Sequence, residues 1–286
     1  MSRQCARNAG FTLIELLVAI VLAAIVASFI VLFLDAPVQS YFAQTRRADL
    51  VDSADRIADA VTADVRTALP NSIRSKPAGS AKALELLATE GAARYYAAGD
   101  KPATTGEELA VGTPLPSFST LDSFNTQALP YQAPYVAVGN LGPPTYDAYN
   151  SASGVITPAA VRINVSANPG APPPPGENQV AASSGTMTFA NAPAPHQAYL
   201  VSGPVSYVCD PVAGTFRRYS GYAVTAAQSV PPAGASALIA HDVSACGISF
   251  GVANPQYGQL AILTVTLTSG GESLRVFLEI PTEYVQ

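Results

Sequence analysis

The carboxylate with the most unusual sequence environment is Glu15, the single ionisable residue between Phe11 and Leu34. An ionised carboxylate inside a bilayer costs about 2.5–3.5 kcal/mol even on lenient insertion scales. Such a group needs a cationic partner, because a buried charge is tolerated only when it is paired. The residue type and its position therefore predict ion pairing within an apolar helical environment.

Few other residues offer chemistry. The histidines are His196, in a proline-rich turn, and His241, whose neighbour Asp242 would point to the opposite face of a strand. The sequence has no D-x-D-x-D-G calcium loop and no glycine-rich loop in a nucleotide-binding context. We expect no enzymatic activity, no cofactor and no metal site.

Glu15 lies in a segment long enough to cross a membrane. The 24 residues 11–34 span about 36 Å as a helix, against a hydrocarbon core of about 30 Å. The preceding residues 1–10 carry Arg3 and Arg7 and no acid, so the N-terminus is expected to stay in the cytoplasm while the rest is exported. A cleaved secretory signal has a shorter apolar region and, like a plain anchor, does not explain Glu15. A buried core helix is a third alternative, but nothing else in the chain is apolar enough to cover it.

The run Gly10-Phe11-Thr12-Leu13-Ile14-Glu15 resembles the class III signal of type IV pilins and type II secretion pseudopilins. The resemblance implies that residues 1–10 are a leader, that a prepilin peptidase cuts between Gly10 and Phe11, and that Phe11 is N-methylated. It also implies an inner-membrane protein with one span and a periplasmic C-terminal part, which later reaches a pilus at the cell surface. The implied partners are other pilins, the peptidase, the inner membrane and an assembly platform.

Cleavage would give Glu15 a partner. The new α-amino group at Phe11 has a reference pKa of about 7.7–8.0 and is mostly cationic at neutral pH. An ammonium of one subunit and the Glu15 carboxylate of its neighbour can neutralise each other in an apolar bundle. Glu15 is therefore predicted to fix the axial register between subunits.

Composition limits the possible partners. The chain has 286 residues, 12% of them charged, and a formal net charge of -5. Loss of Arg3 and Arg7 with the leader would leave 13 basic against 20 acidic side chains. A surface of that sign does not attract nucleic-acid phosphates, so no nucleic-acid partner is expected. The pairs Arg46-Arg47 and Arg217-Arg218 are interpreted as solvated faces.

The cysteines indicate a disulfide. Cys5 falls in the leader, which leaves Cys209 and Cys246 in the exported part, 37 residues apart. Two cysteines in an oxidising compartment favour a disulfide. A metal site is the weaker alternative, since a tetrahedral centre needs four ligands.

The segment 35–70 is predicted to be an amphipathic helix that continues past Pro37. Apolar residues recur at helical spacing and form one stripe. The intervening aspartates, Asp64 among them, are interpreted as a solvated face, and Leu69-Pro70 as the stop. The stripe comprises Leu50, Ala54, Ile57, Ala58, Val61 and Val65.

Residues 71–286 are predicted to form a β-rich globular domain, giving an α+β fold in which the long helix packs on an antiparallel sheet. The clearest hairpin joins 260–267 to 273–280 through Ser269-Gly270-Gly271. Residues 73–134 show only a weak pattern, 169–176 are a proline-rich loop, and the tyrosines near 131–149 are interpreted as loop packing. The remaining expected strands are 161–165, 186–189, 198–201, 205–209, 215–222, 237–240 and 247–252.

The size of the chain and four short segments resemble minor pilins of the mannose-sensitive haemagglutinin (MSHA) type. That resemblance implies a subunit at the tip or in the complex that primes the fibre. The alternatives are a minor pseudopilin of the GspJ type in a type II secretion system and a tip adhesin that binds a surface ligand. The segments are 64–74, 207–210, 214–219 and 245–250.

Overall fold

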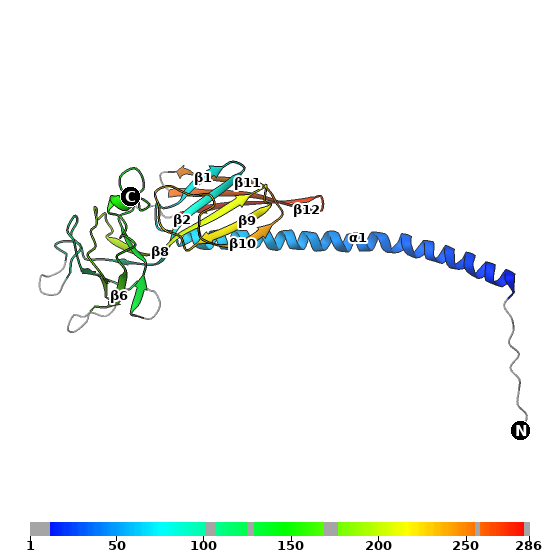
Figure 1. Ribbon diagram of the computed structural model, residues 1–286, viewed down its shortest axis with the longest axis horizontal. Coiled ribbons are helices and arrows are strands. Elements are labelled where there is room, and N and C mark those ends of the chain that lie inside the picture. The colour runs from blue at the N-terminus through cyan, green and yellow to red at the C-terminus, as the bar shows by residue number, and fades with distance from the viewer. Residues whose placement is uncertain (1–11, 101–106, 125–128, 169–176, 255–257, 283–286) are drawn as a thin grey trace, which may run out of the picture. The chain divides into compact units, whose positions relative to one another are not determined.

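The computed structural model describes residues 12–100, 107–124, 129–168, 177–254 and 258–282 (Figure 1). At residues 31, 32, 34–36, 251–254, 258 and 259 it describes the backbone alone. The cleavage pair Gly10 and Phe11 and the proline-rich 169–176 lie outside the described residues. Two compact units divide the chain, Met1–Asp49 and Leu50–Gln286. The predicted α+β class is confirmed: one N-terminal helix is followed by antiparallel sheets.

The helix α1 spans Leu13–Arg66 and contains Pro37. Within the second unit, Leu50, Ile57, Val61 and Val65 are buried, as their spacing predicts, and Ala54 packs against them. The helix ends at Arg66, four residues before its predicted end at residue 70. The reason is that Thr67–Leu69 pairs with a strand instead: Leu69 N donates to Leu87 O at 2.7 Å and Thr89 N to Thr67 O at 3.0 Å.

The largest sheet is fully antiparallel and follows the order β1-β2-β8-β9-β10, with β5 also paired to β8. Figure 1 shows β2, β8, β9 and β10 side by side. The two predicted strands 198–201 and 205–209 are one continuous strand. The bounds are β1 Arg74–Ala78, β2 Ala81–Arg94, β5 Tyr135–Val138, β8 Gln197–Asp210, β9 Thr215–Ser220 and β10 Ala235–His241.

A second sheet has the order β11-β12-β13, with β11 Val243–Asn254, β12 Gly258–Ser269 and β13 Glu272–Pro281. Its last two strands form the predicted hairpin. The connection is Gly270-Gly271, with φ of 57° and 85°. Two successive positive φ angles are typical of a type I′ turn, which glycine adopts without steric cost.

Both sheets bury their inner faces against the C-terminal part of α1. Ile57 and Val61 share one hydrophobic core with Leu86 of β2, Tyr207 of β8 and Val265 of β12. Full burial of an aliphatic side chain of this kind stabilises the fold by about 1.5–3 kcal/mol. The helical stripe therefore supplies the surface that holds the two sheets together.

The predicted disulfide is present. Cys209 of β8 and Cys246 of β11 are bonded, with Cα atoms 6.1 Å apart, and Cys209 is fully buried. The bond links a strand of the main sheet to a strand of the second sheet, and a backbone hydrogen bond from Val243 N of β11 to Gly214 O of the β8–β9 turn, at 3.2 Å, also joins these two parts.

Removing this cross-link is expected to destabilise the second unit. A closed loop of 37 residues is worth about 4 kcal/mol by the chain-entropy estimate. The double variant Cys209→Ala/Cys246→Ala should lower the free energy of unfolding, measured by urea titration, by about this amount. Wild-type protein unfolded in the presence of a reductant is the matched control and should approach the variant. Equal stability of oxidised wild type and variant would contradict the expectation.

Most of the described residues between β2 and β8 form an inserted lobe with a sheet of its own, whereas β5 from the same part of the chain joins the main sheet. The order of the lobe's sheet is β3-β7-β6-β4, and the lobe's core is a separate cluster that includes Phe118, Val165 and Phe189. In Figure 1, β6 lies beyond the ends of β2 and β8, away from β9 and β10. The predicted strand 186–189 is only a single bridge, from Met187 to Leu115. The bounds are β3 Ser117–Ser119, β4 Tyr131–Ala133, β6 Ile163–Ala167 and β7 Asn178–Ala182.

Candidate functional site

Glu15 lies in the first turn of α1. The residue before the helix, Thr12, caps it: Glu15 N donates to Thr12 Oγ1 at 3.3 Å and Leu16 N to Thr12 O at 3.1 Å. Thr12-x-x-Glu15 is thus the spacing of a capping box, in which the acid at the third helical position also favours the helix N-terminus electrostatically. Sequence reasoning missed this second role, although the T-x-x-E spacing was visible.

The start of α1 has no covering protein surface. Within Leu13–Ile30 no residue is buried, and among the described residues this is the one helix long and apolar enough to cross a membrane. The side chains of Leu13 and Ile14, which flank Glu15 in sequence, are 83% and 72% exposed. Apolar area of this size is stable only against lipid or other apolar helices. A cationic partner of Glu15 would therefore have to come from outside this stretch of helix.

A polar cluster fastens α1 to the main sheet. Arg218 Nε donates to Asp64 Oδ2 at 2.7 Å, and Tyr207 OH donates to Asp64 Oδ2 at 2.6 Å and lies 2.8 Å from Ala60 O. Burial and the hydrogen bond to Asp64 raise the pKa of Tyr207, so its hydroxyl stays protonated and keeps donating. The interpretation of Asp64 and Arg218 as solvated residues was wrong, because the helix and β9 bring them together. Asp49, Asp52, Asp55 and Asp59 are exposed as predicted.

A second cluster surrounds Glu85, a carboxylate of β2 that is only 2% exposed. Arg74 Nε donates to Glu85 Oε2 at 2.5 Å, and Tyr222 OH donates to Glu85 Oε1 at 2.9 Å. Arg74 also donates to the carbonyls of Ala226 and Thr225, at 2.7 and 2.9 Å, and its guanidinium lies 3.5 Å from the centre of the Tyr149 ring. The cluster joins β1, β2, the β9–β10 loop and the inserted lobe.

The tyrosines of residues 131–149 pack inside the structure, as the sequence interpretation held. Tyr149 is buried, which raises the pKa of its phenol, and Tyr131, Tyr135 and Tyr146 are partly buried against the cores. They do not form an exposed aromatic platform.

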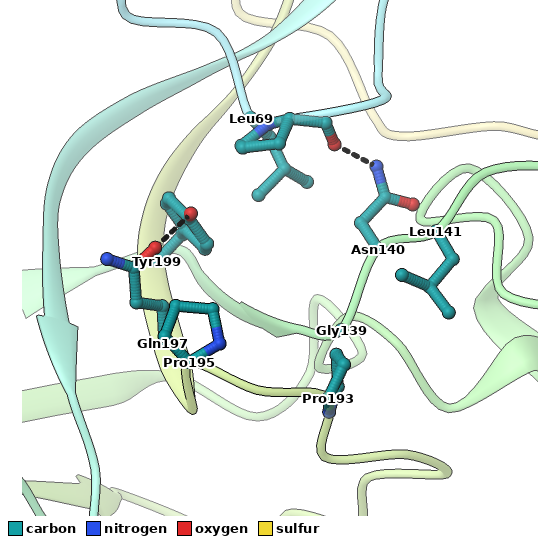
Figure 2. Close-up of a pocket in the computed structure, with 9 residues that line it drawn as sticks. Leu69, Gly139, Asn140, Leu141, Pro193, Pro195, Gln197 and Tyr199 are labelled. Atoms are coloured by element: carbon teal, nitrogen blue, oxygen red, sulfur yellow. Dashed lines mark hydrogen bonds between the residues drawn. The ribbon is translucent and has the colours of Figure 1, made fainter. Parts of the chain in front are cut away.

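The junction between the end of α1 and the inserted lobe encloses a small cavity. Asn140 Nδ2 donates to Pro70 O at 2.7 Å, and Tyr199 OH donates to Gln197 Oε1 at 2.7 Å. Figure 2 shows Gln197 and Tyr199 together on one side of the cavity and Asn140 on the other. The cavity holds about 20 Å³. That volume suits a single water molecule and no organic ligand.

Two features of the described residues concern groups that could support catalysis. His241 Nδ1 lies 2.8 Å from Asp242 Oδ2, a contact that the sequence interpretation excluded. It arises because Asp242 has a φ of 61° and leaves the strand geometry. The run Gly247–Gly251 has the Gly-x-Ser-x-Gly spacing, but Ser249 lies within β11 opposite Ile262 and not on a strand-to-helix turn.

Among the described residues, no three His, Cys, Asp or Glu side chains lie together in a way that could hold an ion.

Comparison with known proteins identifies the N-terminal segment alone. Residues 5–31 match the family described as the prokaryotic N-terminal methylation motif. No curated protein and no solved structure is significantly similar to the chain. The matched residues contain Gly10, Phe11 and Glu15, together with most of the uncovered apolar helix. The motif supports a type IV pilin or pseudopilin, a structural subunit that is processed by a prepilin peptidase and assembled with other pilins.

Proposed function

We propose that this chain is a minor pilin that is cleaved after Gly10, N-methylated at Phe11 and assembled through its N-terminal helix into a type IV pilus. The methylation motif at residues 5–31 is the observation that carries the proposal. The uncovered apolar start of α1 supports it, since a helix of this kind can be held first by a bilayer and then by neighbouring helices.

The proposal assigns a role to each part of the chain. Residues 1–10 are the leader, 11–34 the membrane and polymerisation helix, 35–70 the amphipathic continuation and 71–286 the globular domain. Arg3 and Arg7 favour a cytoplasmic leader and a periplasmic C-terminal part. Glu15 pairs with the N-terminal ammonium of a neighbouring subunit, which fixes the register of the fibre.

The finer proposal is a subunit of the MSHA type, resembling MshO, at the tip or in the priming complex. The large inserted lobe supports a position at the end of a fibre, where added bulk obstructs the fewest neighbours. A GspJ-like pseudopilin of a type II secretion system and a tip adhesin are the alternatives. The flanking genes would separate a pilus from a secretion system. Loss of pili on gene deletion would indicate assembly, whereas normal pili with lost adherence would indicate an adhesin.

Mass spectrometry of the N-terminus tests the processing step. In cells with prepilin peptidase, the mature chain is expected to begin with N-methylated Phe11. The variant Gly10→Glu should retain residues 1–10, because the residue before the cut determines cleavage in the pilin class that the motif resembles. Asn8→Ala, a leader variant outside the Gly10–Glu15 signal, is the control and should be processed normally. An intact leader in the wild-type protein would overturn the proposal.

A further inference from the structure

The inserted lobe carries a shallow cleft of about 370 Å³ on its surface. Pockets of about 300–1,000 Å³ are the usual size for small-molecule sites. Its lining combines apolar side chains, such as those of Ile156, Pro158 and Phe189, with hydroxyl side chains and glycine backbone. The hydroxyl and glycine residues are Gly112, Ser151, Ser153, Gly154, Thr186 and Thr188. None of the functions assigned above uses this cleft.

The walls of the cleft are fixed by backbone hydrogen bonds. Ala190 N donates to Gly154 O at 2.9 Å, and Gly112 N donates to Phe189 O at 2.8 Å, so three separate segments are held together. Gly154 has a φ of 66°, and a Cβ there would lie 2.9 Å from the Cβ of Ala190. Only glycine permits this approach of the two walls. The cleft is therefore formed before any ligand arrives.

The segment 186–190 turns its polar side chains into the cleft. Met187 and Phe189 are buried in the lobe core, whereas Thr186 and Thr188 are exposed. A second wall is the turn Ser151–Ser153, whose N-cap Asn150 accepts a hydrogen bond from Ala152 N at 3.1 Å. A hydroxyl can both donate and accept a hydrogen bond, although Ser153 Oγ already donates to Asp147 O at 2.7 Å and therefore offers a ligand an acceptor.

The chemistry of the lining limits the ligand. None of the described residues that line the cleft is Asp, Glu, Lys, Arg or His, so the cleft offers no side-chain charge to bind a phosphate, carboxylate or ammonium group. A peptide added as a strand would need an unpaired strand edge. At this wall the backbone of Met187 is already bonded to Leu115 in both directions, at 2.8 Å each.

We propose that this cleft binds a neutral carbohydrate unit, with the hydroxyls of Thr186 and Thr188 on one wall and of Ser151 and Ser153 on the other as its hydrogen-bonding groups. A sugar presents hydroxyls that match donor-and-acceptor side chains and adds no charge. The inference goes beyond fibre assembly and does not depend on it, because the cleft lies wholly within the inserted lobe.

The test uses the full chain in a sugar-free zwitterionic detergent, because alkyl glycoside detergents would compete for the cleft. Saturation-transfer NMR against neutral methyl glycosides, sialosides and sulfated sugars identifies the ligand class. The double variant Thr186→Val/Thr188→Val keeps the side-chain shape and removes two hydroxyls. It should weaken binding of the neutral ligand at least tenfold. Thr266→Val on β12 is the matched control and should bind like wild type.

Binding of neutral glycosides that is lost in the double variant and kept in the control supports the proposal, provided that both variants unfold at the wild-type temperature. Absence of binding to every neutral glycoside would overturn it. So would preference for charged sugars, or neutral binding that the double variant leaves unchanged. Processing at Gly10 is measured separately, so failure here leaves the proposed pilin function standing.

Discussion

The variant Glu15→Ala is expected to reach the membrane at wild-type levels and to fall at least about tenfold in the sheared fibre fraction. An unpaired ammonium left in an apolar helix bundle costs about 2.5 kcal/mol or more, which exceeds the 1.4 kcal/mol that corresponds to a factor of ten. Quantitative immunoblots of membrane and fibre fractions measure both amounts.

The capping interaction at Thr12 makes a sharper control possible. Glutamine satisfies a capping box as glutamate does, so Glu15→Gln preserves the helix start and removes only the charge. Thr12→Ala does the reverse, at a cost of about 1 kcal/mol in helix stability. If charge pairing governs assembly, Glu15→Gln fails as Glu15→Ala does, while Thr12→Ala assembles. Normal incorporation of Glu15→Gln would show that capping, and not pairing, is the function of this residue.

The variant Arg74→Ala is expected to lower the free energy of unfolding by about 3 kcal/mol. Removal of one partner of a buried ion pair typically costs about 3–5 kcal/mol, because the remaining charge is uncompensated. We expect a loss at the lower end of this range, because the pair is not completely buried: the Arg74 side chain is 21% exposed, whereas that of Glu85 is only 2% exposed. The same substitution also leaves the carbonyls of Thr225 and Ala226 without this donor. Urea titration followed by circular dichroism gives the value.

A paired replacement separates charge from packing at this position. In Arg74→Met/Glu85→Leu no buried charge remains, so the loss should be clearly smaller than in Arg74→Ala. Arg217→Ala is the surface control, since the Arg217 side chain makes an exposed hydrogen bond of 3.3 Å to Ser236. It should change stability by no more than about 0.5 kcal/mol. A double variant as unstable as Arg74→Ala would contradict the role of the unpaired charge.

The features that could be predicted from sequence are those with a local signal. Composition alone predicts the apolar helix from Leu13 to Ile30. The alternation of polar and apolar residues, together with two glycines, predicts the β12–β13 hairpin. The strand β2 was missed because Ala83–Leu87 is buried on both faces, so it has no alternation of polar and apolar residues. Its main partner, β8, begins about a hundred residues later.

The polar clusters could not be predicted for a similar reason. Asp64 is one of several aspartates on α1 and differs from the others only because β9 places Arg218 beside it. Glu85 lies in a weakly patterned segment, and its partners come from β1 and from the loop after β9. Long-range topology, and not residue type, decides which of these charges is buried.

The strand pair β2–β8 ends where Arg94 lies opposite Gln197. The chain enters the inserted lobe after Arg94 and returns from it at Gln197. A two-residue turn could join an antiparallel pair at that point, and the free energy of closing a loop rises only slowly with its length. The lobe is therefore an insertion into one strand pair that is tied back to the sheet by β5, which pairs with β8. Away from β5 and from the contacts of Asn140 and Tyr149, its sequence can diverge or enlarge without altering the register of β2 against β8 or the helix stripe, which packs in a different core.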